Sequence, residues 1–144
     1  ACPCAMETVK DRLAEENPKH RKWIKKMPTM THNQRNRTTL MIEVPEKYDV
    51  EAEDLIKIVE DSLSSPTYEI LKRGDEGSLV YMAHQNPKFV EDVVRDILGK
   101  VLRKYRKLPN DVLVTVKSES EESIHKHNAF AERVTTLGEI RKGV

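Results

Sequence analysis

The chain has 144 residues, and 34% of them are charged, with 25 basic residues against 24 acidic ones. This length fits one domain with a hydrophobic core of its own. The net charge of +1 gives no reason to expect nucleic acid as the main partner. No apolar run approaches the roughly 20 residues that a membrane span needs, so we expect no membrane partner either.

The two cysteines, Cys2 and Cys4, are separated by a single residue. This spacing is too short for an easy disulfide, so it predicts a reduced, intracellular protein with a cytoplasmic location. The chain begins with Ala1 rather than with Met, and Cys2 lies at its edge. We therefore expect a fragment or a processed product from which an N-terminal partner segment is missing.

The first elements are helical. Apolar residues at helical spacing predict a helix over residues 5–16, which Pro18 interrupts. A basic run follows over residues 19–26. It is either a phosphate-binding patch or, as we prefer, a solvated helix end with Trp23 and Ile24 turned inward.

Residues 37–44 alternate apolar and polar side chains and therefore predict a strand with one apolar face. A helix is expected next, with Asp49 as its N-cap, and residues 64–66 end it. The apolar stripe of this helix comprises Ala52, Leu55, Ile56, Val59 and Leu63.

The middle of the chain is less regular. Residues 67–72 suggest a short strand, residues 73–77 a turn, and residues 79–84 either a strand or the start of a helix. Asn86 and Pro87 predict the start of a further helix, as N-cap and first helical residue. Its apolar stripe is the longest in the chain: Val90, Val93, Val94, Ile97, Leu98, Val101, Leu102 and Tyr105.

The clearest strand prediction covers residues 112–117, where valines alternate with other side chains. The structure of residues 129–144 stays open. Two helices with one apolar face each, placed among strands, predict an α+β fold with an antiparallel sheet and the helices on one side.

A stretch rich in carboxylates and imidazoles follows this last strand. His125 and His127 would share one side of a strand extension, because side chains alternate with period two, and Glu122 precedes them. With a cysteine thiolate, these donors suit zinc or ferrous iron and leave a position open for water. Such a histidine pair is usually a surface pair, and the cysteine pair and the polar residues 31–35 also have ordinary structural explanations. Three such clusters in one small chain favour a site.

Glu91 lies in the first turn of the helix with the longest apolar stripe. A carboxylate at this position is often only a partner of the helix dipole. The functional alternative is a carboxylate that accepts two N–H bonds from a flat heterocycle such as guanine.

Five separated motifs occur in the same order in a known family. The chain resembles the second GTP cyclohydrolase family, of the bacterial type IB and archaeal methanopterin-pathway kind, and is similar to its C-terminal half. The long charged segment over residues 7–26 and the Ala-Cys-Pro-Cys-Ala start resemble the archaeal branch. The motifs are Ala1-Cys2-Pro3-Cys4, His32-Asn33-Gln34-Arg35, Lys72-Arg73-Gly74-Asp75-Glu76, Asn86-Pro87-Lys88-Phe89-Val90-Glu91-Asp92 and Glu122-Ser123-Ile124-His125-Lys126-His127.

The resemblance implies an α+β tunnelling fold, with an antiparallel sheet and two helices on one face. It implies homo-oligomers with active sites at subunit interfaces, and a single catalytic domain over residues 1–144 that lacks the family's N-terminal half. The substrate would be GTP, whose guanine imidazole ring is opened at C8. The archaeal branch forms 7,8-dihydroneopterin 2',3'-cyclic phosphate and the bacterial branch 7,8-dihydroneopterin triphosphate. Rival interpretations are a non-catalytic metal-binding or ligand-binding module and, less favoured by the charge, a nucleic-acid binder.

The resemblance also implies residue roles. The metal ligands would be Cys2, preferred over Cys4, with His32, Glu76 and Glu122. The metal is expected to be Fe(II), with zinc or manganese as alternatives. The catalytic residues would be His125 and His127, together with Cys2 through its metal. Glu91 would bind the guanine edge. The triphosphate would be bound by Arg35, Lys72 and Arg73.

Overall fold

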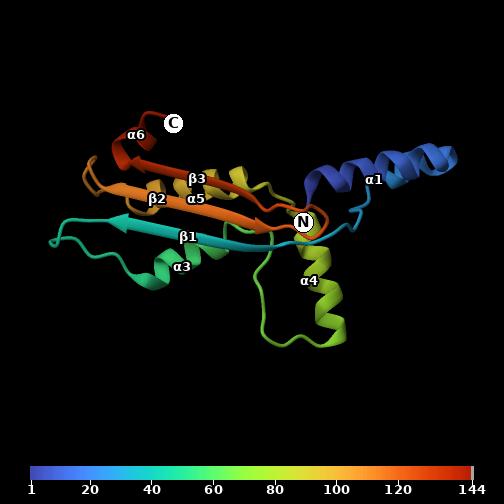
Figure 1. Cartoon of the computed structure of the whole chain (residues 1–144), viewed down its shortest axis with the longest axis horizontal. Helices are drawn as coiled ribbons and strands as arrows, with labels where there is room; N and C mark the ends of the chain where they lie inside the picture. Colours follow the sequence, from blue (N-terminus) through green and yellow to red (C-terminus); the bar gives the residue numbers. More distant parts are fainter. Residues whose placement is uncertain (144) are drawn as a thin grey trace. The chain divides into compact units, whose positions relative to one another are not determined.

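The computed structural model describes residues 1–143 of the chain (Figure 1). They divide into two compact units. The first comprises Ala1–Gln34 and Ser64–Phe89, and the second comprises Arg35–Leu63 and the residues from Val90 onward. Within the described residues, no helix is both long and apolar enough to cross a membrane.

The second unit is built on an antiparallel sheet in the order β1-β2-β3 (Figure 1). Its strands are β1 (Arg35–Glu43), β2 (Leu113–Glu121) and β3 (Ala129–Thr136). The predictions of β1 and β2 from alternating apolar residues are confirmed, whereas β3 lies within residues 129–144, for which the sequence predicts no particular structure. The register pairs apolar residues of the two predicted strands, because Leu40 faces Val116 and Ile42 faces Val114.

One face of this sheet carries the core. Helices α3 (Ala52–Glu60) and α5 (Val90–Lys104) pack on this face. The short helix α6 (Leu137–Arg141), which follows β3 in the chain, contacts α5 and contributes Leu137 and Ile140 to the core. The α+β prediction, with helices covering an antiparallel sheet, is therefore confirmed. The buried core consists of Ile58, Val93, Val94, Ile97, Leu98, Val101, Tyr105, Leu108, Val112, Val114, Val116, Leu137 and Ile140.

Two predictions about α3 are wrong. The helix begins at Ala52, after Glu51, and not directly after Asp49. Leu55, Val59 and Leu63 of the predicted stripe do pack against the core, but the buried residue of the helix is Ile58, and Ile56 is 57% exposed. Asp54 also forms an ion pair with Lys104 of α5 at 2.7 Å. Residues three or four apart share one helix side, so Ile58 packs into the core from the same side of α3 as Leu55.

The first unit contains α1 (Pro3–Glu16), the 3-10 helix η1 (Pro18–His20), α2 (Arg21–Ile24) and α4 (Arg73–Gln85). The helix over residues 5–16 is confirmed as most of α1. The inward orientation expected for Trp23 is wrong, because this side chain is 64% exposed. A helix of four residues makes one turn and offers few inward positions, and the half-buried Ile24 takes one.

The expected turn at residues 73–77 is also wrong, because these residues are the first turns of α4. The carboxylate of Asp75 accepts a hydrogen bond from the Lys72 amide at 3.2 Å and so closes the N-terminus of this helix. Neither Gly74 nor Gly77 has a positive φ, so both fit an ordinary helix. The possible strand at residues 67–72 is irregular backbone, and residues 79–84 are helical.

The start of α5 lies later than predicted. Asn86 follows α4 as its C-terminal cap, with φ −132° and ψ 58°, and α5 begins at Val90. The residue before a proline is disfavoured in the helical region, which explains why Asn86 leaves the helix before Pro87. The apolar stripe predicted for α5 is confirmed, because its buried residues are Val90, Val93, Val94, Ile97, Leu98 and Val101.

Near the C-terminal end of the second unit, the ionised side chain of Glu139 is expected to stabilise the fold in a pH-dependent way. The carboxylate of Glu139 accepts hydrogen bonds from the Thr135 hydroxyl at 2.6 Å and from the Thr136 amide at 3.0 Å. These bonds, the Thr135 bond foremost, lower the pKa of the Glu139 carboxyl in the folded protein. Ionised Glu139 therefore stabilises the fold above the ordinary glutamate pKa of 4.5, and this contribution is lost as the pH falls through the lower, folded pKa.

The Glu139→Gln variant is accordingly expected to unfold at a lower temperature than the wild type at neutral pH. The difference should shrink as the pH falls below 4.5, where the carboxyl is protonated first in the unfolded chain and then, at its lower pKa, in the folded protein. Thermal unfolding followed by circular dichroism at several pH values measures this, with the exposed Glu46→Gln as control. A difference that is constant over the whole pH range would show that the carboxylate charge is not responsible.

Candidate functional site

The loop between β2 and β3 carries the imidazole-rich motif. Strand β2 ends at Glu121, so the expected extension of the strand through His125 and His127 is wrong. The two imidazole rings nevertheless lie side by side, with centroids 5.5 Å apart and planes 15° from parallel. Both side chains are exposed, and Glu122 at the start of the same loop is half-buried. The loop thus brings two imidazoles together within reach of solvent.

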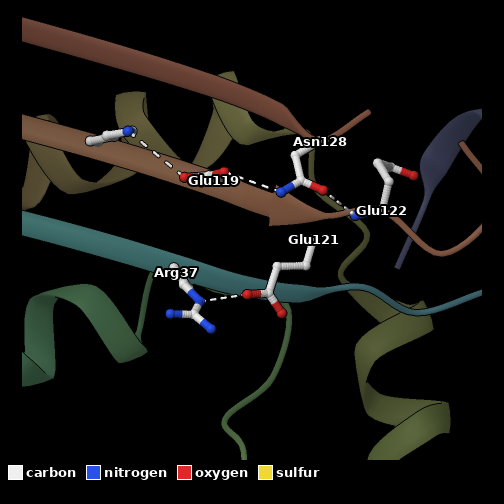
Figure 2. Close-up of polar contacts among 6 residues, drawn as sticks. Arg37, Glu119, Glu121, Glu122 and Asn128 are labelled. Atoms are coloured by element: carbon white, nitrogen blue, oxygen red, sulfur yellow. Dashed lines mark hydrogen bonds and ion pairs between the residues drawn. The ribbon is translucent and has the colours of Figure 1, made fainter. Parts of the chain in front are cut away.

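Asn128 holds this loop closed, as Figure 2 shows. Its side-chain amide donates to a carboxylate oxygen of Glu119 on β2, and its side-chain oxygen accepts from the backbone amide of Glu122, both at 3.2 Å. An ion pair between Arg37 and Glu121 joins β1 to the end of β2 beside it (Figure 2). The sequence alone did not predict a role for Asn128. Asparagine at the end of a loop is a recognisable signal, because its side chain readily bonds nearby backbone.

The cysteines lie at the start of α1. Cys2 is the residue before the helix and is half-buried, whereas Cys4 lies in its first turn and is exposed. The Thr8 hydroxyl donates to the backbone carbonyl of Cys4 at 3.0 Å, so this contact does not involve the sulfur. Neither thiol forms a disulfide within residues 1–143. Both remain available as thiolate donors, and the preference for Cys2 over Cys4 stays a prediction.

His32 shows an unusual feature for a histidine outside a core. Its Nε2 atom is buried, yet no described residue forms a hydrogen bond with it. A buried polar atom normally has a partner, and an unprotonated imidazole nitrogen is a good metal ligand. Together with the thiol and carboxylate donors of the predicted set, this atom fits a borderline divalent metal.

The start of α4 carries three candidate residues, Lys72, Arg73 and Glu76, and all are exposed. Lys72 is the N-cap residue and Arg73 begins the helix. The bond that closes this helix end is made by Asp75 and not by Glu76. Two cations beside the amide groups of a helix N-terminus suit phosphate oxygens.

Arg35 and Glu91 belong to the second unit, at the start of β1 and in the first turn of α5, and both are exposed. The candidate residues thus fall into two sets. The first unit holds Cys2, His32, Lys72, Arg73 and Glu76, and the second holds Arg35, Glu91, Glu122, His125 and His127. Within residues 1–143, no three or more His, Cys, Asp or Glu side chains lie close enough to hold a metal ion. The predicted ligand set therefore stays a prediction.

Residues 1–131 match the family described as type I GTP cyclohydrolase folE2. The chain belongs to this family of GTP cyclohydrolases.

Its relatives include archaeal proteins named GTP cyclohydrolase MptA. The chain is 48% identical to the Methanosarcina mazei protein, over 100% of the chain and 48% of that protein. It is 49% identical to the Methanosphaera stadtmanae protein and 47% identical to the Methanobrevibacter smithii protein, over 98% of the chain and 47% of each relative. The chain spans about half the length of the curated relatives it matches.

Proposed function

We propose that this chain forms part of a metal-dependent GTP cyclohydrolase that opens the guanine imidazole ring at C8. The observation that carries this proposal is the similarity of the entire chain to proteins named GTP cyclohydrolase MptA, at 48% identity for the Methanosarcina mazei protein. The product proposed is 7,8-dihydroneopterin 2',3'-cyclic phosphate, for methanopterin synthesis. The bacterial-type product, the triphosphate, is the alternative.

The proposed metal ligands are Cys2, His32, Glu76 and Glu122, with Fe(II) as the metal and zinc or manganese as alternatives. The buried, unpartnered Nε2 atom of His32 among the described residues supports this set, as does its mixture of sulfur, nitrogen and oxygen donors. When bound, a divalent metal supplies Lewis acidity that makes water a usable nucleophile near neutral pH.

The chain's own residues bind the substrate and move protons. A neutral imidazole can accept a proton and an imidazolium can release one, so His125 and His127, exposed in one loop, are suited to proton transfer at the purine and ribose atoms. Glu91 would bind the guanine edge through paired, charge-assisted hydrogen bonds. Arg35, Lys72 and Arg73 would bind the phosphates.

The proposal includes the tunnelling fold, a homo-oligomer with interfacial active sites and the participation of an N-terminal half. The topology of the second unit supports assembly, since β1 and β3 lie at the two edges of the sheet formed by the described strands. Edge strands present unpaired backbone groups that another subunit can bond. The face of the sheet away from the core also carries exposed apolar residues, among them Met41, Phe130 and Val134.

The test is the conversion of GTP under anaerobic conditions by the chain, alone and with a family N-terminal half supplied. With Fe(II) added, we expect GTP to be consumed and a fluorescent pterin to form after oxidation, and a chelator should abolish the conversion. Mass spectrometry of the product distinguishes the cyclic phosphate from the triphosphate. Tight metal binding without any turnover of GTP would instead indicate a non-catalytic metal-binding module.

A further inference from the structure

His84 is a buried histidine that the proposed chemistry does not use. It lies in the last turns of α4 and is 1% exposed. Both ring nitrogens have partners within the first unit. Its Nδ1 atom lies 2.7 Å from the carbonyl oxygen of Val80, one turn earlier in the helix, and its Nε2 atom lies 2.9 Å from the backbone nitrogen of Thr31.

These partners determine which nitrogen carries the proton. The Val80 carbonyl can only accept, so Nδ1 must donate and is protonated. The Thr31 amide can only donate, so Nε2 must accept and is unprotonated. His84 is therefore held as the neutral Nδ1–H tautomer. Neither a protonated imidazole nor the other tautomer could accept the Thr31 bond.

The bond to Thr31 joins two segments that are 53 residues apart in sequence. Thr31 immediately precedes His32, whose Nε2 atom is buried without a partner among the described residues. The helix on the other side of the bond, α4, also carries Glu76, about two turns before His84. The imidazole thus ties the backbone next to one predicted metal ligand to the helix that carries another.

We propose that His84 is a positioning residue that fixes the backbone at Thr31 and so orients the His32 imidazole for metal binding. This inference rests on the proposed function, because it assumes that His32 is a ligand. Groups that orient metal ligands typically change metal affinity by roughly 10- to 100-fold when they are replaced. A histidine that only fills the interior of the unit would affect stability and leave the affinity of the folded protein unchanged.

Two substitutions separate these roles in the full chain. In His84→Gln, the side-chain oxygen reaches the position of Nε2 and can accept the Thr31 bond, so this variant should keep the wild-type affinity for Zn(II). In His84→Asn, the shorter amide stays near the position of Nδ1 and cannot reach Thr31. We expect it to bind Zn(II) roughly 10- to 100-fold more weakly than the wild type. The exposed His20→Gln is the matched control and should bind normally.

The measurement is competition for Zn(II) against a chromophoric chelator, on chains whose folding is checked by circular dichroism. Long-range nitrogen–proton spectra of the wild type give the tautomer independently of any metal, and a proton on Nε2 of His84 would overturn the inference. A folded His84→Asn variant with wild-type affinity for Zn(II) would also overturn the inference. The proposed function would remain intact in that case if His32→Ala loses the metal. If His32→Ala binds Zn(II) as well as the wild type, the proposed metal site is wrong and this inference falls with it.

If His84→Asn fails to fold, the inference is tested by the Zn(II) affinity of His84→Gln and by the tautomer of His84 in the wild type. Wild-type affinity in His84→Gln together with an unprotonated Nε2 supports the inference. Weakened binding in a folded His84→Gln contradicts it, because the accepted bond is then not what matters.

Discussion

Cys2→Ala and His32→Ala are each expected to abolish the proposed metal-dependent conversion of GTP. Each substitution removes a strong metal donor, the thiolate or the imidazole whose Nε2 atom is buried without a partner among the described residues. A catalytic metal supplies several kcal/mol of transition-state stabilisation, so its loss corresponds to roughly 1,000-fold or more in rate. Initial rates of GTP consumption at saturating Fe(II), with the bound metal measured in parallel, give both effects.

Cys4→Ala and His20→Ala are the matched controls, because both residues are exposed and of the same types. They should keep the rate within a few-fold of the wild type. If Cys4→Ala loses activity and Cys2→Ala does not, the thiolate ligand is Cys4. If Cys2→Ala and His32→Ala both convert GTP normally, the metal-ligand assignment is wrong.

Ile97→Ala is expected to destabilise the second unit by about 2–5 kcal/mol, the range for such truncations in a packed core. Ile97 is 0% exposed on α5 and belongs to the core that joins the helices to the sheet. Removing its side chain leaves a cavity that rigid neighbours on α5 and β2 can fill only in part. Urea denaturation followed by circular dichroism measures the loss as a lower midpoint at unchanged slope.

Ile56→Ala is the control of the same type, since Ile56 is 57% exposed on α3. It should change the free energy of unfolding by less than about 0.5 kcal/mol, as expected for a surface substitution. Equal destabilisation by the two variants would contradict the assignment of Ile97 to the core and of Ile56 to the surface.

The sequence by itself determined the scaffold of the second unit. Valines at positions 112, 114 and 116 alternate with period two, and the burial of Val112 just before β2 and of Val114 and Val116 within it follows from that pattern. The stripe from Val90 to Val101 has the helical period and is buried along α5 for the same reason. Periodicity is a local property of the chain, so these elements could be predicted without any knowledge of their partners.

Other features were decided by tertiary contacts. Strand β3 forms one edge of the sheet, and of its residues only Thr135 is buried, so no regular apolar face marked it in the sequence. Its pairing with β2 orders it. The side of α3 that faces inward is set by its packing against α5 and β1. Such choices depend on residues that are distant in sequence.

For the candidate site, too, some features could be predicted from the sequence and others only from the structure. The sequence singled out His125, His127 and His32 by their residue types and spacing. The structure added that the two loop imidazoles stack, that Asn128 closes their loop, and that His84 bonds the backbone beside His32. A hydrogen bond between residues 31 and 84 leaves no periodic trace in the sequence, because only the folded unit brings the amide and the imidazole together. Residue types indicated the chemistry, and the tertiary structure decided which groups hold one another in place.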